Sequence, residues 1–155
     1  MQHEQAQIHE FMVKAEQTTP DRPTMPDFDT RVLRVKLIWE ELFELIDAYG
    51  FKPVVTDGQL TLLETAPPSL RDAYDAVLDL LVVTIGAGVA MGTRLEPGWE
   101  EVHRSNMSKF IDGYRRADGK WIKGPSYSPT RLQPVLDAQT EEARMRDGQT
   151  SLPLT

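Results

Sequence analysis

The sequence predicts an all-α protein, a helical bundle that is completed by homo-oligomerisation. Three observations support this prediction. Long apolar segments have helical spacing, Gly and Pro residues separate them, and the segment around Trp39 is apolar on nearly its whole circumference. A helix that is apolar on all sides is buried on most of them. In a chain of 155 residues, we therefore expect this helix to pack against partner subunits as well as within its own subunit.

The length fits one domain. We assign this domain to residues 1–146, and we expect a flexible C-terminal tail over 147–155. The first helix is expected over 4–15, and a last short helix over 137–145. Three prolines make 18–28 an extended connection between the first two helices.

The second helix should begin after Asp29, a suitable N-cap, run to Tyr49 and stop at Gly50. After it, the Asp57-Gly58 pair lies between β-prone residues. This pattern predicts a small hairpin over 54–62. An irregular loop fits the same residues equally well.

The third helix has a recognisable start. Ser69 with Asp72 three residues later is similar to a capping box, with Asp in the usual Glu or Gln place. We expect the helix to run to about Met91 and to end at Gly92. The fourth helix should begin near Pro97, because proline is favoured in the first turn.

Composition limits the classes of protein to consider. The net charge is −7, from 24 acidic and 17 basic residues, which argues against a nucleic-acid polymer or an anionic membrane as partner. The absence of cysteine excludes disulfides and thiolate chemistry. The longest apolar stretch, 80–91, is shorter than a membrane span, and residues 1–10 lack the pattern of a signal peptide. We expect a cytoplasmic protein, in the host cytoplasm if the chain is phage-encoded.

Acidic residues embedded in the second and third helices are the main functional signal. They are Glu40, Glu41, Glu44 and Asp47 on one helix, and Asp72, Asp75 and Asp79 on the other. Residues four apart are stacked on a helix, so each helix presents a stripe of carboxylates. A carboxylate is costly to bury without a partner, and a row of them calls for a cation. Hard oxygen ligands suit Mg²⁺ or Mn²⁺ and suit zinc or copper poorly. Such ions commonly serve a phosphate substrate.

Two other kinds of helix also carry acids. A solvated helix face would carry acids too, but the apolar neighbours leave little solvated face here. A di-iron bundle needs Glu-x-x-His pairs, which the three histidines, His3, His9 and His103, do not supply. We expect Trp39 and Trp99 in the hydrophobic core.

A basic segment follows the fourth helix. It holds seven of the 17 basic residues, namely Arg104, Lys109, Arg115, Arg116, Lys120, Lys123 and Arg131. Only Asp112 and Asp118 oppose them within the segment. Positive charge gathered next to turns could hold a polyphosphate. A solvated loop that balances the acids of the protein is the alternative.

Four motifs occur in order: Glu40-Glu41-x-x-Glu44, Asp75-x-x-x-Asp79-Leu80-Leu81, Val102-His103-Arg104-Ser105-Asn106-Met107-Ser108-Lys109, and Asp118-Gly119-Lys120-x-x-Lys123. Together they resemble the MazG-like all-α NTP pyrophosphohydrolases, over about residues 11–132. The resemblance is closest to the small bacterial and phage members that include dimeric dUTPase-like enzymes. Many relatives carry Glu three residues before the aspartate of the second motif. Here Ala76 occupies that place, and Asp75 is expected to substitute.

The resemblance implies Mg²⁺-dependent hydrolysis of a (d)NTP, such as dUTP or dGTP, to the monophosphate and pyrophosphate, in control of a nucleotide pool. It implies two or more Mg²⁺ ions per site, replaceable by Mn²⁺, and a dimer or a dimer of dimers. The implied catalytic and metal-binding residues are Glu40, Glu41 and Glu44, with Asp75 and Asp79 as further metal ligands. The implied phosphate- or sugar-binding residues are Asn106, Lys109, Lys120 and Lys123.

Two alternatives stay open. One is a metal-stabilised helical regulatory or oligomerisation module without catalysis. The other is a related pyrophosphohydrolase that acts on a phosphoribosyl nucleotide. A panel of substrates, scored by the products released, separates all three.

Overall fold

The structure, a computed structural model, describes residues 1–150, with side chains to residue 148. The elements in chain order are α1 (Gln2–Lys14), α2 (Phe28–Ala48), β1 (Phe51–Thr56), β2 (Gln59–Glu64), α3 (Leu70–Ala90), α4 (Leu95–Ser108), β3 (Tyr114–Arg115), β4 (Trp121–Ile122) and α5 (Leu132–Thr150). The expectation of a mainly helical protein is confirmed, with two small two-stranded sheets added.

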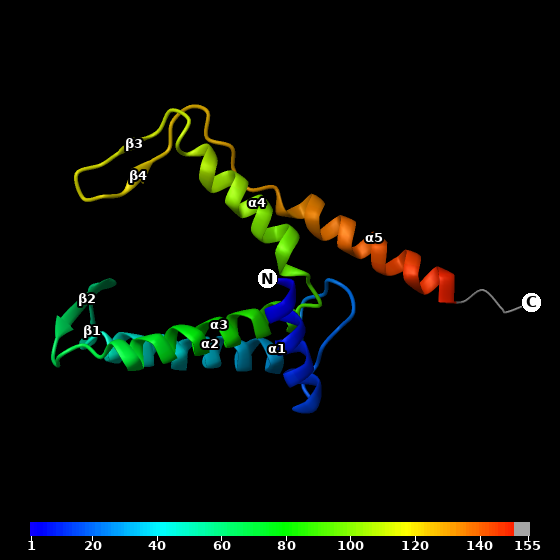
Figure 1. Ribbon diagram of the computed structural model, residues 1–155, viewed down its shortest axis with the longest axis horizontal. Coiled ribbons are helices and arrows are strands. Elements are labelled where there is room, and N and C mark those ends of the chain that lie inside the picture. Colours follow the sequence, from blue (N-terminus) through cyan, green and yellow to red (C-terminus); the bar gives the residue numbers. More distant parts are fainter. Residues whose placement is uncertain (151–155) are drawn as a thin grey trace, which may run out of the picture.

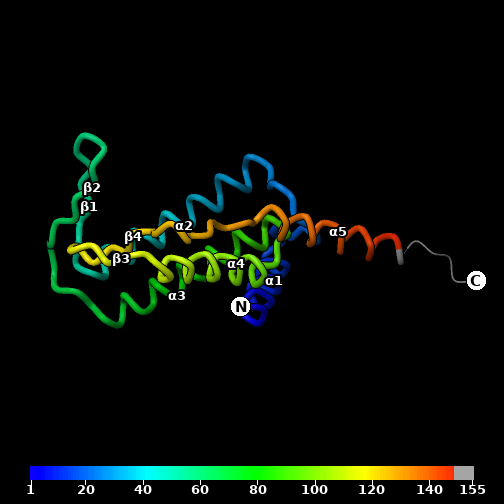
Figure 2. The backbone as a smooth tube through the Cα atoms, turned by 90° about the horizontal axis from the view of Figure 1, so that it is seen from above, coloured from blue at the N-terminus to red at the C-terminus, as the bar shows by residue number. Residues whose placement is uncertain are grey.

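The elements form two arms that diverge from a common junction (Figure 1). One arm is the antiparallel pair α2 and α3, with the β1–β2 hairpin at its far end, and α1 crosses its base. The other arm is α4, which carries the β3–β4 hairpin at its tip. From that tip the chain returns along α4 into α5, which continues away from the junction on the opposite side, as the view from above also shows (Figure 2).

Local capping sets the starts of α2 and α3. Ser69 Oγ accepts a hydrogen bond from the backbone N–H of Asp72, 3.3 Å away, as expected from the capping pattern. The start of α2 differs from the prediction, because Asp27 rather than Asp29 is the N-cap. Asp27 Oδ1 accepts from the backbone N–H of Thr30 at 2.8 Å. At the other end of α2, Gly50 has a φ of +77°, a conformation that favours glycine at a helix end.

The turn between β1 and β2 decides between hairpin and loop. Asp57 and Gly58 have φ angles of +52° and +74°, as a two-residue type I′ turn requires. The strands pair in register from Thr56 and Gln59 beside the turn to Phe51 and Glu64 at the base. The hairpin is therefore longer than the predicted 54–62.

The core of the described chain is small and lies where α1, α3 and the start of α4 meet. Met12, Ile85, Val89 and Ala90 form its buried cluster. Gly88 lets α4 approach closely, since an added Cβ would lie 2.7 Å from a Leu95 methyl carbon. The core therefore fixes the junction of the two arms and leaves much of each arm unsupported.

Helix α3 is apolar along most of its length. Its 21 residues meet the length and composition criteria for a membrane-spanning helix. The apolar helix is thus longer than the stretch 80–91 expected from the sequence. The core helix of a soluble protein meets the same criteria. Here α3 packs along α2 and carries Asp72, Asp75 and Asp79 in its first half.

The C-terminal part differs from the expectation. A single helix, α5, replaces the short helix predicted over 137–145, so residues 147–150 continue this helix instead of beginning the predicted tail. Residues 151–155 of that tail lie outside the described residues. The β3–β4 hairpin was not predicted, because its strands have only two residues each.

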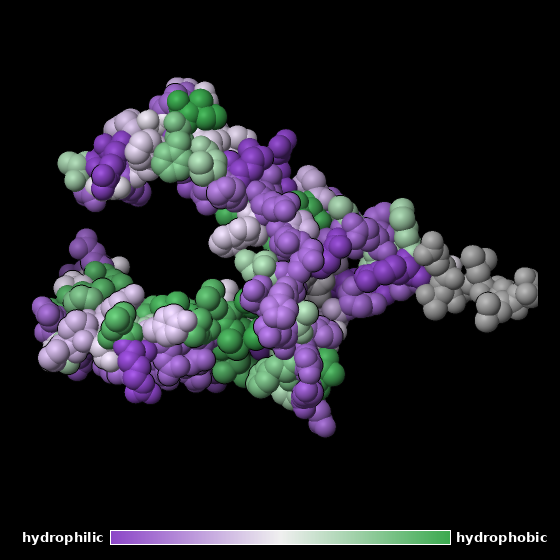
Figure 3. Space-filling view, viewed as in Figure 1, coloured by the Kyte–Doolittle hydropathy of each residue, from purple (hydrophilic) through white to green (hydrophobic). Residues whose placement is uncertain are grey.

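The chain exposes far more surface than its size requires. Its accessible surface is 11556 Å², whereas a compact monomer of 17.6 kDa exposes about 7,900 Å². Apolar side chains gather over the α2–α3 arm (Figure 3). Trp39, expected in the core, is 61% exposed, and Trp99 on the other arm is 60% exposed. Both expectations of burial are wrong for the single chain.

Candidate active site

The antiparallel pairing of α2 and α3 brings their acids together. Glu41 is the half-buried member. Burial is the first cause that raises the pKa of its carboxyl group, and the charges of Glu44, Asp79 and Glu40 raise this pKa further. The charges of these three acids, which belong to both helices, therefore act on Glu41.

A cavity of about 470 Å³ continues this group toward the hairpin end of the arm. Its walls include the carboxylates of Glu44, Asp47, Asp72 and Asp75, beside the small side chain of Ala76. Because Glu44 belongs both to the cavity and to the surroundings of Glu41, the acids form one row. We call this row the acidic seam: Glu40, Glu41, Glu44, Asp47, Asp72, Asp75 and Asp79.

The negative charge of the seam is almost uncompensated. Asp72 pairs with its chain neighbour Arg71 at 3.1 Å. Within residues 1–148, no side-chain hydrogen bond or ion pair is found for the other six acids. The carboxylates of the described chain form a row, and no three of them converge closely enough to enclose an ion.

The donor atoms of the seam, though spread along a row, are of a type that suits magnesium. They are carboxylate oxygens, the ligand type that Mg²⁺ prefers. Several like charges without a cation are unfavourable, and Glu41 shows this in its raised pKa. Glu40, Glu41, Glu44, Asp75 and Asp79 could supply ligands from two facing helices. At the departure from the family pattern, buried Ala76 and its neighbour Asp75 both line the cavity.

On the other arm, part of the basic segment is structural. The guanidinium of Arg104 makes two hydrogen bonds to Glu101, at 2.7 and 2.8 Å, and also holds Pro129 O at 2.9 Å. The backbone N–H of Arg131 donates to Glu101 as well. These contacts lower the pKa of Glu101 to about 2, with the Arg104 hydrogen bond as the first cause. Arg104 and Arg131 therefore hold the returning chain against α4.

The end of α4 positions two of the expected binding residues. Lys109 Nζ donates to Asn106 Oδ1 at 2.6 Å. Trp121 Nε1 donates to Lys109 O at 2.7 Å, and the Trp121 ring packs on Phe110. Gly113 is needed at this crossing, since an added Cβ would lie 2.1 Å from Lys109 O.

Lys123 lies over an aromatic ring nearby. Its Nζ is 4.0 Å from the centroid of the Tyr127 ring, a cation–π geometry. Ser105 Oγ lies 3.3 Å from the Tyr127 hydroxyl oxygen, so the ring is tied to the buried face of α4. Hydrogen bonds from Ser105 and then Lys123 lower the pKa of Tyr127, and the charge of Lys109 adds to this.

Four cations of this arm have no ion pair within residues 1–148: Lys109, Arg115, Lys120 and Lys123. Three of them are expected binding residues. Arg115, the fourth, belongs to the predicted basic segment but not to the residues that the family resemblance implies. By contrast, Arg116 is committed to Asp118, whose side chain also accepts from the backbone N–H of Lys120 at 3.1 Å. We call these four residues the basic tip.

The structure thus assembles the acids as one group and most of the basic residues as another, but it does not bring the two groups together. The acidic seam lies on the α2–α3 arm, and the basic tip lies at the end of the other arm (Figure 1). The space between the arms is open to solvent (Figure 3).

The family model of phosphoribosyl-ATP pyrophosphohydrolases (PRA-PH) matches residues 6–106. This chain belongs to that family. The protein is accordingly a pyrophosphohydrolase, a hydrolase of phosphoric anhydrides that acts on a nucleotide, within the MazG-like all-α superfamily. The match leaves the non-catalytic module without support, and it favours the phosphoribosyl-nucleotide alternative over the (d)NTP interpretation. No curated protein matches the chain.

The match covers the entire acidic seam and ends at Asn106, before Lys109, Lys120 and Lys123. The part of this pyrophosphohydrolase that carries the acids is therefore the part that the family shares. The basic tip lies beyond it.

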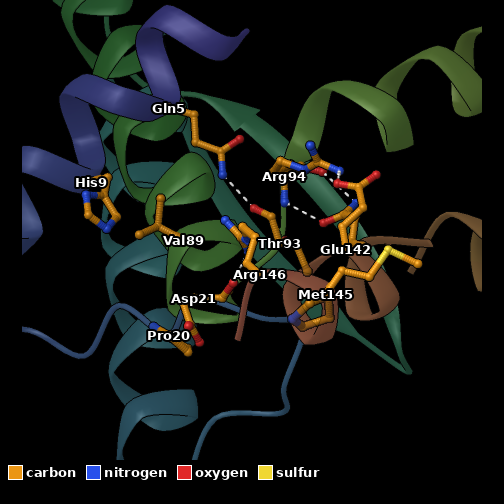
Figure 4. A pocket seen from close by; sticks show the side chains of 13 residues that line it. Gln5, His9, Pro20, Asp21, Val89, Thr93, Arg94, Glu142, Met145 and Arg146 are labelled. Atoms are coloured by element: carbon orange, nitrogen blue, oxygen red, sulfur yellow. Dashed lines mark hydrogen bonds and ion pairs between the residues drawn. The ribbon is translucent and has the colours of Figure 1, made fainter. Parts of the chain in front are cut away.

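A larger cavity of the pyrophosphohydrolase, about 580 Å³, lies at the junction of α1, α3 and α5. Its polar groups mostly satisfy one another, as Figure 4 shows. Gln5 Nε2 donates to Thr93 O, and Arg94 pairs with Glu142 at 2.5 Å. With its charges paired in this way, the cavity lacks the uncompensated acids that a hydrolytic site needs.

Proposed function

We propose that this protein is a Mg²⁺-dependent pyrophosphohydrolase of a phosphoribosyl nucleotide, which it converts to the monophosphate with release of pyrophosphate. The supporting observation is that the family match and the acidic seam coincide. The matched residues, 6–106, contain all seven acids of the seam.

Glu40, Glu41, Glu44, Asp75 and Asp79 would hold Mg²⁺, or Mn²⁺ in its place, with two or more ions in the row. When bound, the metal neutralises charge on the phosphate oxygens and lowers the pKa of a bound water. One of the glutamates that is not fully occupied with metal would orient this water and accept its proton.

The basic tip supplies the complementary charge. Lys109, Lys120 and Lys123 would hold phosphate oxygens, and Asn106 would bind phosphate or sugar. Asn106 and Lys109 are already hydrogen-bonded to each other, so they would act as one unit. The triphosphate chain would lie between these cations and the metal-bearing acids.

We further propose a homo-oligomer. The chain exposes about 3,600 Å² more than a compact monomer of its size, and a standard interface needs only about 800 Å² per partner. An apolar cavity of about 460 Å³ lies between α3, α4 and α5, and its lining includes Leu81, Trp99 and Leu136. Another subunit would bind there. A second copy would fill the open space between the arms and bring a basic tip and an acidic seam together.

A (d)NTP such as dUTP or dGTP is the second candidate substrate. It stays a candidate because the family match ends before Lys109, Lys120 and Lys123. The residues expected to contact the substrate are therefore largely outside the shared region, and specificity depends on such contacts.

The test is a panel of phosphoribosyl-ATP, dNTPs and NTPs, each incubated with the protein and Mg²⁺ or EDTA. We expect pyrophosphate and a monophosphate to be released, fastest from the phosphoribosyl nucleotide and not with EDTA. Faster turnover of a dNTP would select the second candidate. Release of single phosphates, or turnover in EDTA, would contradict the proposal.

A matched pair of variants tests the seam. Glu44→Gln removes a charge from the seam, and Glu100→Gln removes one from an exposed position on α4. Mutating a residue that hydrogen-bonds a metal ligand typically lowers metal affinity or activity by about 10–100-fold. Removing the ligand itself should lower turnover by more than this. Glu100→Gln should retain full activity. Equal activity of the two variants, at unchanged oligomeric mass, would refute a ligand role for Glu44.

A further inference from the structure

The β1–β2 hairpin has two chemically different faces. Residues paired across the strands lie on the same face of a hairpin. The pairs Phe51 with Glu64, Pro53 with Leu62 and Val55 with Leu60 therefore share one face. We call the two pairs nearer the turn, Pro53 with Leu62 and Val55 with Leu60, the apolar hairpin face. The opposite face carries the pairs Lys52 with Leu63, Val54 with Thr61 and Thr56 with Gln59.

The apolar hairpin face is uncovered in the single chain. Val55 is 70% exposed, Leu60 63% and Leu62 44%. The hairpin stands at the far end of the α2–α3 arm, away from the core at the junction (Figure 1). An isolated two-stranded hairpin is at best marginally stable in water, and packing of its apolar face is what normally stabilises it.

We propose that the apolar hairpin face docks on a second copy of this chain and fastens the oligomer. This inference rests on the homo-oligomer proposed above, and it names a contact outside the helices. The excess exposed surface of the chain supplies enough area for such a contact. The apolar side chains that are exposed along α2 and α3, such as Trp39 and Leu78, give a second copy a matching apolar surface.

The charge of the hairpin favours a protein partner. Its charged residues are Lys52, Asp57 and Glu64, so it lacks the cluster of cations that a nucleic acid or an anionic membrane would need. The face is also narrow, with two cross-strand pairs at its centre. Such a surface suits insertion against another apolar surface of the same assembly.

The experiment compares two double variants of one strand. Leu60→Glu with Leu62→Glu places two charges on the apolar hairpin face. Gln59→Glu with Thr61→Glu places two charges on the opposite face of the same strand. The oligomeric mass of each protein is measured by light scattering over a range of concentrations, after circular dichroism has shown equal helix content.

We expect the dissociation constant of the first variant to be about 10-fold or more above that of the wild type, because each 1.4 kcal/mol of lost binding free energy is a factor of ten. The control variant should assemble as the wild type does. Equal dissociation constants for both variants would overturn the proposal.

Hydrogen exchange on the wild type provides a second measurement that does not depend on the variants folding. Amides of residues 51–64 should be protected in the oligomer and should exchange faster on dilution below the dissociation constant. Exchange that is unchanged by dilution would overturn the hairpin contact alone. A wild type that is monomeric at every concentration would overturn the homo-oligomer as well. Pyrophosphate release in the substrate panel would still test the hydrolysis independently.

Discussion

Glu41 on α2 and Asp79 on α3 repel each other across the paired helices. Burial and the charge of Glu44 are the larger causes that raise the pKa of Glu41, and the carboxylate of Asp79 adds to them from the neighbouring helix. The protein thus keeps like charges together at a cost in stability. Such an arrangement is useful only where a cation or a positively charged partner offsets it.

Replacing Glu41 with Gln should stabilise the metal-free protein at neutral pH. A carboxyl group whose pKa is raised in the folded state favours folding below its unfolded value, here 4.5, and loses that contribution as the pH rises through the folded pKa. We therefore expect Glu41→Gln to raise the melting temperature by a few degrees at pH 7 and by less at pH 4. Thermal melts in EDTA at both pH values measure this. A lower melting temperature at pH 7 would contradict it.

Mg²⁺ should reverse that difference. A ligand that binds only the folded state stabilises it by an amount that grows with the logarithm of its concentration once this exceeds the dissociation constant. The wild type should melt at a higher temperature as Mg²⁺ is added, and Glu41→Gln should gain less. If Mg²⁺ and Mn²⁺ at up to millimolar concentrations leave the melting temperatures of both proteins unchanged, the seam does not hold a metal.

The ring of Tyr127 should act through Lys123. The Lys123 ammonium lies 4.0 Å above this ring, so Tyr127→Phe keeps the platform and Tyr127→Leu removes it. A cation–π contact is worth about 0.5–1 kcal/mol at exposed sites. We expect Tyr127→Leu to raise the KM by about 2–5-fold with little change in kcat, and Tyr127→Phe to behave like the wild type. Steady-state kinetics measure this, with Lys123→Ala as the reference variant. Equal losses of activity in Tyr127→Phe and Tyr127→Leu would contradict a role of the ring through Lys123.

Glu101 should make the stability of the arm formed by α4 depend on pH in the acidic range. Its pKa is lowered to about 2, first by the Arg104 hydrogen bond. A group with a lowered pKa contributes stability above its unfolded value, 4.5, and loses it as the pH falls toward the folded pKa. Glu101→Gln should therefore lower the melting temperature by a few degrees at pH 7, and the difference from the wild type should shrink by pH 3. Glu100→Gln is the control, expected to show no difference at either pH.

Arg34 is a buried cation with one side-chain partner. Its Nη2 donates to Gln17 Oε1 at 2.6 Å, its Nε has no hydrogen-bond partner, and burial lowers its pKa. Replacing a buried ion pair with apolar side chains of similar volume is often neutral or stabilising, by about 1–4 kcal/mol, and among the described residues Arg34 has only the neutral Gln17 as a side-chain partner to offset its burial. We expect Arg34→Met to unfold at an equal or higher denaturant concentration. Gln17→Leu should destabilise by about 1–3 kcal/mol, because it leaves the buried guanidinium unpaired.

A double-mutant cycle on this pair provides the check. With Arg34 already replaced by Met, the Gln17→Leu change should cost much less than it does alone. Additive costs would show that the two side chains are not coupled. A strong loss of stability in Arg34→Met alone would indicate that its guanidinium has a further partner in the assembled protein.

The long helices and the acid row were predictable because their signals are local. Ser69 with Asp72 marks a helix start within four residues, and the Asp57-Gly58 pair marks a turn within two. Where two local signals compete, the sequence cannot choose between them. Asp27 and Asp29 are both good N-caps, and only the structure shows that Asp27 reaches the N–H of Thr30.

Long-range contacts were the harder part. The β3–β4 hairpin depends on Trp121 reaching back to Lys109 O, a contact between residues far apart in the sequence. The exposure of Trp39 has a similar origin, because helical spacing shows that a face is apolar but not which chain covers it. The ion pair of Glu101 with Arg104 could have been predicted from the sequence. Arg104 lies three residues later on the same helix, the spacing at which ion pairs form.

The small core at the junction has a consequence for any measurement on this protein. Seven apolar residues are buried among the described part of the chain, so a single chain supplies little of the driving force for its own folding. If the proposed homo-oligomer supplies the rest, unfolding should be a reaction whose midpoint shifts with protein concentration. A sample diluted for an enzyme assay and a sample prepared for spectroscopy would melt at different temperatures, and a melting temperature would have meaning only beside the concentration at which it was recorded.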